Sequence, residues 1–332
     1  MKRLFLVMRH LLGYIVVCFL LIGCGSESDF KDRLQPVPEN SGFRMDDYFV
    51  WCGSVIEVDG LFHMFASRWP KQTGFPEGYR RYSEIVRATA DHPEGPYTFQ
   101  EIIIGKRDSV YWDACMAHNP TVHKIDNQYV LFYIGSDFTT LRSGTSLLLR
   151  RVGYATADSI EGPWTRCDAP IIDEESNNPA IYLESDMRVK MLYRDADLKV
   201  IMAEAPSFKG PYATVNDNVW PECRLEDFYL FKMHGLYRFI CEDNVGGISG
   251  HERWGVELIS DNGIDGWRKA DPAVVYDHAI KYTSGRILHC TRRERPQLLI
   301  CNGKITHLIT SVFDGKDAWS QPVEIKPPID IR

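Results

Sequence analysis

The 332-residue sequence lacks the motifs of several large enzyme classes, and it has no excess of positive charge. It contains no Gly-x-Ser-x-Gly and no usable GxGxxG, P-loop or HExxH pattern, which argues against an α/β-hydrolase, a nucleotide-binding enzyme and a zinc protease. No CxxC pair occurs, so a structural zinc site has no support. The net charge of −7 argues against a nucleic-acid-binding protein.

The first residues have the pattern of an export signal. A basic stretch containing Lys2, Arg3 and Arg9 precedes an apolar run over residues 11–22, which is too short for a typical membrane span. The run ends in Leu-Ile-Gly-Cys, which is similar to a bacterial lipobox, so we expect Cys24 to be lipidated. The alternative is an ordinary signal peptide with a chance cysteine.

This pattern divides the chain into three parts. We expect a lipoprotein signal peptide over residues 1–23, a polar tether over 24–40 and a single domain over 41–332. The protein would then be exported and anchored to a membrane by lipid. Seven cysteines follow Cys24, and we expect them to be mainly buried apolar residues with one or two disulfides among them.

Helical periodicity is scarce after residue 40, and β-type patterns take its place. The 16 Tyr, 16 Phe and 8 Trp suit β-structure. Short apolar runs recur in pairs around tight turns such as Asp59-Gly60 and Asn302-Gly303, which are hairpin signals. Five such hairpins begin near residues 52, 119, 178, 226 and 295.

A second element repeats between the hairpins. An apolar strand leads to a glycine-proline-aromatic turn at Gly95-Pro96-Tyr97, Gly162-Pro163-Trp164 and Gly210-Pro211-Tyr212, and to Gly266-Trp267 in a fourth copy. Repetition at this spacing indicates a repeat architecture. We therefore predict an all-β, five-bladed β-propeller with four antiparallel strands per blade. A β-sandwich is the alternative, but it does not predict the same turn three times.

The residues that begin each predicted inner strand are mostly polar. In a propeller these positions converge on one pocket at the mouth of the central channel. They are Trp51 to Ser54, His118 to Pro120, Asn177 to Pro179, Glu226 to Phe228 and Glu294 to Pro296.

With these motifs the sequence resembles the five-bladed propeller glycosidases, glycoside hydrolase family 43 and relatives such as family 117, over roughly residues 45–325. The resemblance implies a lipoprotein of the type found in polysaccharide-degrading Bacteroidetes. Family 43 enzymes carry three catalytic carboxylates, at positions that match Cys52, Asn178 and Glu226 here. The resemblance therefore implies one retained group, Glu226, as general acid, and it puts the standard family 43 mechanism in doubt.

Glycoside hydrolysis usually needs two carboxyl groups on opposite sides of the scissile bond. Glu226 and Asp227 are neighbours on a strand, so we expect them to point to opposite faces, with Glu226 in the pocket. Asp113, beside the potential sugar-stacking residue Trp112, is the first choice for the partner, and Asp46 and Asp47 are the reserve. His118 at the start of blade two and His251 in a glycine-rich loop are further acid–base candidates.

Other residues near the expected pocket suit sugar binding. Indole rings offer flat apolar faces, amides offer hydrogen bonds, and arginines that converge would favour a uronate or a sulfated sugar. Besides Trp112, the candidates for substrate binding are Trp51, Arg68, Trp69, Asn119, Asn178, Arg194, Asp227 and Arg295.

The leading prediction is a glycoside hydrolase that acts on an oligosaccharide or polysaccharide fragment in the central pocket. A polysaccharide lyase and a non-catalytic glycan-binding lipoprotein are the alternatives. No cofactor is expected. Propellers of this kind often hold Ca²⁺ in the channel, but no EF-hand-type loop places its ligands here. The sugar, the linkage, the stereochemical outcome and the oligomeric state are left open.

Overall fold

A computed structural model describes residues 29–145 and 147–332 of the protein. The expected signal peptide and Cys24 lie outside the described residues. Among the residues that are described, no helix is long and apolar enough to cross a membrane.

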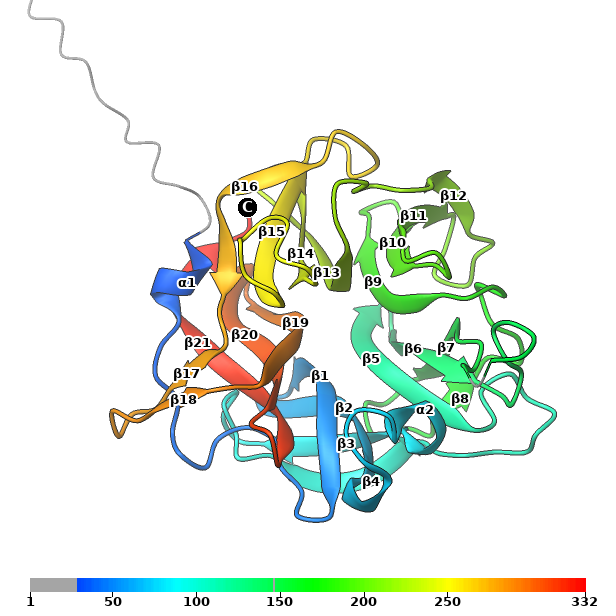
Figure 1. The fold of residues 1–332 in the computed structure, drawn as a ribbon, viewed down its shortest axis with the longest axis horizontal. Coiled ribbons are helices and arrows are strands. Elements are labelled where there is room, and N and C mark those ends of the chain that lie inside the picture. Colours follow the sequence, from blue (N-terminus) through cyan, green and yellow to red (C-terminus); the bar gives the residue numbers. More distant parts are fainter. Residues whose placement is uncertain (1–28, 146) are drawn as a thin grey trace, which may run out of the picture.

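Five antiparallel sheets surround a central axis, which confirms the predicted five-bladed propeller (Figure 1). Blade one contains β1 (Tyr48–Val58), β2 (Leu61–Pro70), β3 (Glu84–Ala90) and β4 (Thr98–Ile104). Blade two contains β5 (Met116–Ile125), β6 (Gln128–Ser136), β7 (Arg151–Ala157) and β8 (Thr165–Arg166). Blade three contains β9 (Asn177–Leu183), β10 (Val189–Arg194), β11 (Val200–Ala205) and β12 (Ala213–Asn216).

Blade four contains β13 (Leu225–Met233), β14 (Leu236–Asp243), β15 (Trp254–Ser260) and β16 (Arg268–Tyr276). Blade five contains β19 (Arg292–Cys301), β20 (Lys304–Phe313) and β21 (Ala318–Asp330). A small hairpin of β17 (Ala279–Lys281) and β18 (Ile287–His289) connects blades four and five. The described helices are short: α1 (Phe30–Arg33), a 3₁₀ turn (Lys71–Thr73) and α2 (Tyr79–Tyr82).

The repeated sequence signals correspond to repeated turns. Asp59 and Gly60 both have positive φ, 52° and 81°, as a two-residue hairpin turn of type I′ requires. Asn302 and Gly303 adopt the same conformation with φ of 52° and 72°. Each of the three glycine-proline-aromatic segments follows the third strand of its blade and leads into the fourth.

Blade five has three strands of its own, and the segment before blade one covers its outer edge. Leu34 and Phe43 form β-bridges to Ile325 and Ser320 of β21. The backbone N–H of Gln35 donates to the backbone carbonyl of Glu324 over 2.9 Å. The side chain of Phe30 in α1 is fully buried. Part of the predicted polar tether, in residues 30–37, is therefore packed against the propeller and pairs with the edge of blade five.

Each pair of neighbouring blades shares an apolar core. Phe132 and Met191, for example, belong to the core between blades two and three, and Phe228 belongs to the core between blades three and four. Burial of each such side chain contributes on the order of 2 kcal/mol, so the five interfaces together hold the blades in a closed ring.

The seven described cysteines are all free thiols, so the expected disulfides are not formed. Cys52, Cys115, Cys241 and Cys290 are buried, as expected of small apolar residues.

Candidate active site

The five inner strands share a β-bulge at the same place. In each blade the pairing between the first and second strands shifts beside one residue with φ between 53° and 59°. These five residues are Cys52, Asn119, Asn178, Asp227 and Arg295. A bulge interrupts the alternation of side chains along a strand. Residues before and at the bulge can therefore both face the axis.

Hydrogen bonds connect the bulge residues around the axis. The Cys52 thiol donates to Asn119 Oδ1 over 2.8 Å, and the Asn119 amide donates to Asn178 Oδ1 over 3.0 Å. The Asn178 amide donates to Asp227 Oδ1 over 2.7 Å, and the Arg295 backbone N–H donates to Asp227 Oδ2 over 3.2 Å. We call these five residues the axial ring. The ring forms a polar floor across the centre of the propeller.

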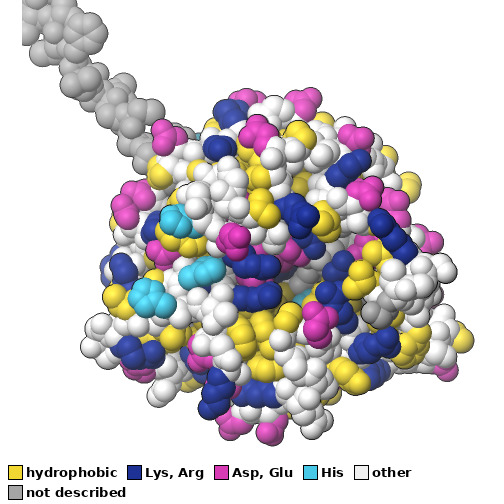
Figure 2. Space-filling model, in the orientation of Figure 1, with side chains coloured by type: hydrophobic (Ala, Val, Ile, Leu, Met, Phe, Trp, Pro, Cys, Tyr) yellow, Lys and Arg dark blue, Asp and Glu magenta, His cyan; other side chains and the backbone are white. Residues whose placement is uncertain are grey.

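A cavity of about 390 Å³ lies at this floor and has lining residues from all five blades. Figure 2 shows Lys and Arg side chains gathered around the central hollow. Both Glu226 and Asp227 line this cavity. The expectation that they point to opposite faces therefore does not hold, because the bulge at Asp227 breaks the regular alternation.

One side of the cavity is lined by Glu226, Asp227 and Glu294. We call these residues, together with the fully buried Glu242 and their partners, the carboxylate face. Arg194 pairs with Glu226 over 2.5 Å. The Asn244 amide donates to both Glu226 and Glu242, over 3.3 and 2.9 Å.

The same face contains an arginine between two glutamates. Arg253 Nη1 lies 3.0 Å from Glu242 Oε1 and 2.8 Å from Glu294 Oε1. Opposite charges thus alternate across blades three, four and five.

Burial gives the acidic groups of this face unusual proton affinities. Burial and the neighbouring Glu226 raise the pKa of Asp227 to about 6. Burial and Asp227 raise the pKa of Glu294 to about 7, and burial and Glu294 hold the pKa of Glu242 well above its ordinary value. Like charges in a poorly hydrated site disfavour ionisation of the whole group. The site therefore retains protons on carboxyl groups near neutral pH.

The opposite side, which we call the aromatic face, consists of Trp51, Trp69, Phe75, Tyr79 and His118. Phe75 stacks on Trp69 with ring centres 5.8 Å apart, and the His118 ring stacks on Tyr79 at 4.5 Å. These rings come from blade one, the segment before α2, α2 itself and blade two. Such a wall suits the apolar face of a sugar ring.

His118 is fixed by contacts on both nitrogens. Ser83 Oγ lies 2.8 Å from its Nδ1, and Cys52 Sγ lies 3.8 Å from its Nε2. Burial, together with the charges of Arg295 and Arg150, holds the pKa of His118 well below its ordinary value. The imidazole is therefore neutral at physiological pH, and it does not supply an imidazolium proton.

Among the described residues, three carboxylates have the spacing of a metal site. Oxygens of Asp227, Glu242 and Glu294 lie within 4.8 Å of one another. The guanidinium of Arg253 already contacts two of the three and supplies positive charge there. A divalent cation would have to compete with this arginine, so the donor set fits a bound metal poorly.

The structure brings most of the predicted site residues together at the cavity. Those that line it are Trp51, Trp69, His118, Asn119, Asn178, Arg194, Glu226 and Asp227. Five other predicted residues do not line it: Arg68, Trp112, Asp113, His251 and Arg295.

Asp113 and Trp112 lie inside blade two instead. The Asp113 carboxylate is fully buried, pairs with Arg107 and Arg166, and accepts a 2.7 Å hydrogen bond from Tyr133. Trp112 packs so closely against Gly153 that a Cβ atom there would overlap the indole. These residues therefore have packing partners that account for them, and Asp113 does not face Glu226 across the cavity.

The other three also have partners elsewhere. Arg68 of β2 pairs with Glu84 of β3 over 2.8 Å within blade one. His251 is exposed and stacks on Trp254 at 3.8 Å. The fully buried Arg295 donates from Nη2 to the Pro179 carbonyl, 3.0 Å away.

Several cavity residues were missed in the sequence because they lie outside the inner strands. Tyr79 comes from α2, and Phe75 comes from the segment before it. Arg150 and Arg253 each stand directly before the third strand of a blade. Comparing that repeat position between blades two and four would have found both arginines.

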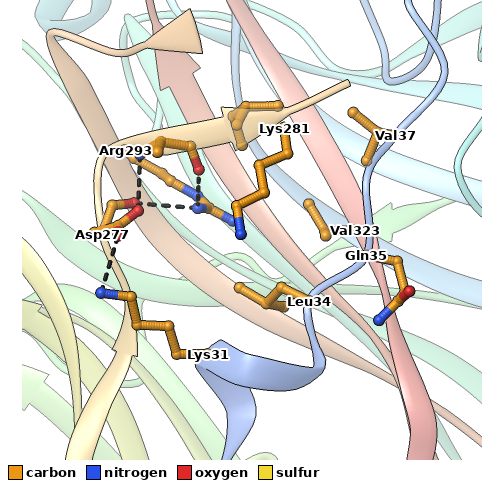
Figure 3. A pocket seen from close by; sticks show the side chains of 10 residues that line it. Lys31, Leu34, Gln35, Val37, Asp277, Lys281, Arg293 and Val323 are labelled. Atoms are coloured by element: carbon orange, nitrogen blue, oxygen red, sulfur yellow. Dashed lines mark hydrogen bonds and ion pairs between the residues drawn. The ribbon is translucent and has the colours of Figure 1, made fainter. Parts of the chain in front are cut away.

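Another, much smaller cavity lies beside α1 (Figure 3). Its volume is about 50 Å³, and Lys31 pairs with Asp277 at its edge over 2.9 Å. Arg293 donates to the carbonyls of Asp277 and Ala279 there. This cavity is too small for a sugar and belongs to the docking of the N-terminal segment.

No protein-family model matches the sequence, and no curated protein is significantly similar to it. Solved structures share its fold. One of them, a glycoside hydrolase, is 13% identical, with a TM-score of 0.65 over 91% of this protein and 93% of that one. Zg3597, a family 117 glycoside hydrolase of Zobellia galactanivorans, is 14% identical, with a TM-score of 0.60 over 87% and 88%.

The catalytic domain of the Coprinopsis cinerea family 62 α-L-arabinofuranosidase is 13% identical, with a TM-score of 0.62 over 90% of this protein and 98% of that one. Family 43 enzymes are among the similar structures as well. The protein therefore has the five-bladed propeller fold found in glycoside hydrolases of families 43, 62 and 117.

Proposed function

We propose that the protein is a glycoside hydrolase whose catalytic carboxyl groups are Glu226 and Glu294. The observation that carries this proposal is the pair of unlike environments on the carboxylate face. Arg194 pairs with Glu226 and supplies positive charge beside it, whereas the pKa of Glu294 is raised to about 7. Acid–base hydrolysis of a glycoside uses two carboxyl groups whose environments differ.

In this mechanism Glu294 donates its proton to the glycosidic oxygen as the bond to the leaving sugar breaks. Glu226, which lies with Glu294 on the carboxylate face, acts at the anomeric carbon, as a base toward water or as a nucleophile. We assign proton donation to Glu294, although the family resemblance implies it for Glu226, because Glu294 is the group that holds a proton near neutral pH.

The shape of the cavity supports action at the end of a glycan chain. The axial ring forms the floor beneath the cavity, so a chain threading through the propeller would meet its hydrogen-bonded side chains. The aromatic face offers a stacking surface for the terminal sugar. Arginines from several blades line the same space, and we therefore include acidic oligosaccharides among the substrates. They are Arg80, Arg150, Arg194, Arg253 and Arg292.

The test is release of reducing sugar from a panel of neutral and acidic oligosaccharides. Glu226→Gln and Glu294→Gln are each expected to lower kcat by about 10²- to 10⁴-fold. The matched control is Glu101→Gln, which removes a glutamate paired with Arg87 outside the cavity, and it should leave kcat within about twofold. Aryl glycosides with good leaving groups should rescue Glu294→Gln but not Glu226→Gln.

Equal activity of Glu226→Gln and wild type would overturn the proposal. A second candidate is a polysaccharide lyase, which is favoured by the contact of the Tyr79 hydroxyl with Arg150, 3.3 Å away, because this places a phenol beside a cation in the cavity. An ultraviolet-absorbing unsaturated product would support the lyase. Binding to glycans without any turnover would identify a glycan-binding protein.

We also propose that Cys24 is lipidated and that the exported protein is held on a membrane. The lipobox-like sequence before Cys24 supports this proposal. Mass spectrometry of the N-terminal peptide should find a diacylglyceryl cysteine, and Cys24→Ala should move the protein to the soluble fraction. An unmodified Cys24 in the membrane fraction would contradict it.

A further inference from the structure

Two arginines of the carboxylate face converge on a single oxygen. Arg253 Nη1 lies 2.8 Å and Arg292 Nη1 lies 3.5 Å from Glu294 Oε1. Both side chains line the cavity, and both are about one-third exposed, at 32% and 30%. Two guanidinium groups are therefore directed at one place that a ligand in the cavity can reach.

The nitrogens of these arginines are only partly used by the protein. Within residues 29–145 and 147–332, Arg253 contacts carboxylates through Nη1 alone, and Arg292 has one carboxylate contact, at 3.5 Å. Arg150 is the opposite case. Its Nε and Nη2 bind Glu175, its Nη1 reaches Tyr79, and its side chain is only 15% exposed. All three nitrogens of Arg150 therefore bind groups of the protein itself, whereas Arg253 and Arg292 retain N–H donors for a ligand.

The neighbouring aromatic ring orients one of the two arginines. The Arg292 guanidinium lies 5.7 Å from the centre of the Phe75 ring, and Phe75 also lines the cavity. A guanidinium held against an aromatic ring keeps its outer edge available for two parallel hydrogen bonds. A carboxylate or sulfate accepts such a pair of bonds, and a hydroxyl group does not.

We propose that Arg253 and Arg292 form an anion subsite that binds a carboxylate or sulfate ester on the substrate, next to Glu294. The inference rests on the proposed function, because it places the anionic sugar in the same cavity. The Glu294 carboxyl group shares the two guanidinium groups with this anion. Substrates would then be uronic acids or sulfated sugars rather than their neutral counterparts.

The test measures binding to full-length Glu226→Gln protein, so that turnover does not interfere. The probes are galacturonate, glucuronate and galactose 6-sulfate, each compared with its neutral parent sugar by calorimetric competition. We expect at least one acidic probe to bind about tenfold or more tightly than its parent, since hydrogen bonds to charged groups are the strong ones. The uronate and sulfate probes separate the two sources of charge.

Adding Arg292→Gln to the Glu226→Gln protein should reduce the preference for acidic over neutral sugars to about twofold. Arg292→Lys in the same background should retain part of this preference. The matched control is Arg268→Gln, which removes an exposed arginine paired with Asp261 on β16. It should leave the preference unchanged. Arg292 is chosen because it is partly exposed and its removal is compatible with folding.

Neutral sugars that bind as tightly as acidic ones would overturn the anion subsite, as would an acid preference that survives Arg292→Gln unchanged. Hydrolysis of neutral oligosaccharides by the wild type would in that case leave the proposed function standing. If the protein binds acidic sugars selectively but hydrolyses no member of the panel, the anion subsite is supported and the proposed hydrolase function is overturned.

Discussion

In each blade, one residue of the second strand pairs with the residue that precedes the bulge on the first strand. Blades one and five differ from blades three and four in the type of residue at this position. In blades one and five this position is a serine, Ser67 and Ser311, whose hydroxyl accepts a hydrogen bond from the backbone N–H of the next bulge residue. In blades three and four it is charged, Arg194 and Glu242. The serines join blade to blade, whereas the charged residues build the carboxylate face.

The two pairs of blades show how one repeated backbone provides both structure and chemistry. The bulge delivers a side chain to the axis in every blade, so the geometry is the same throughout. The chemistry depends on the residue at this position: each serine makes an interblade hydrogen bond, whereas Arg194 lines the cavity and the buried Glu242 pairs with Arg253. The aromatic face comes from blades one and two with α2 and the segment before it, and the carboxylate face comes from blades three, four and five.

The strongest test of this difference is to give blade three the residue of blade one. Arg194→Ser removes the cation 2.5 Å from Glu226 and should lower kcat by about 10²- to 10³-fold, since a preorganised charge in the site is lost. Ser67→Ala in blade one should lower the free energy of unfolding by about 1 kcal/mol and leave kcat within about threefold. If Arg194→Ser and Ser67→Ala lower kcat equally in steady-state assays, the proposed difference in role between blades one and three is contradicted.

A second prediction compares two arginines that share one carboxylate oxygen. Arg253→Met leaves the buried Glu242 and Glu294 without their closest cation and should lower the free energy of unfolding by about 3 kcal/mol. Arg292→Met removes the more distant partner, 3.5 Å away, and should cost about 1 kcal/mol or less. Urea denaturation of both variants measures the difference, and equal values would show that the buried glutamates do not depend on Arg253.

A third prediction concerns pH. Because the pKa of Glu294 is raised to about 7 in the folded protein, the folded state binds more protons than the unfolded state between about pH 4 and 7. This group's contribution to stability is therefore greatest at low pH and falls as the pH rises toward 7. The free energy of unfolding of Glu294→Gln relative to wild type should rise over this window by about 3 kcal/mol and then level off.

Chemical denaturation at a series of pH values tests this prediction. Glu101→Gln is again the control, because Glu101 is partly exposed outside the cavity. A difference between Glu294→Gln and wild type that does not change with pH would mean that folding does not raise the pKa of Glu294.

The smallest expected effect is on the aromatic face. Phe75→Ala removes a half-buried ring from the cavity wall and should raise KM by about fivefold to tenfold, in line with about 1 kcal/mol for an aromatic contact. The chemical step should be nearly unchanged, so kcat should stay within about twofold. A large fall in kcat with a constant KM would place this face in the chemistry rather than in binding.

The sequence was most informative where the signals are local. Turn pairs such as Asp59-Gly60 and the glycine-proline-aromatic segments act within a few residues, so they predicted the hairpins, the third and fourth strands and the number of blades. The edge of blade five was missed because residues 34–43 contact β21 from the far end of the chain. The expected disulfides failed for a similar reason, since Cys spacing does not report which thiols meet.

The candidate site was only partly predictable. The start of each inner strand correctly drew attention to Glu226 and Asn178, because repeat symmetry brings equivalent positions to one axis. Asp113 was chosen for its place beside a tryptophan shortly before an inner strand, but its carboxylate turns into blade two toward Tyr133. Tyr79 was not predicted, because it lies in a connecting segment without a periodic pattern. Arg253 was missed because only the starts of the inner strands were compared between blades.

The architecture follows from the amino-acid sequence alone, because the hairpins and turns that define a blade depend on short-range backbone preferences repeated along the chain. Which charges meet depends instead on the closed ring. The bulge at Asp227 turns two adjacent acids toward the same cavity, and the packing of blade five against blade four brings Arg253 to Glu294. Their proton affinities follow from burial and from neighbours distant in the chain, so they exist only once the blades have closed around the axis.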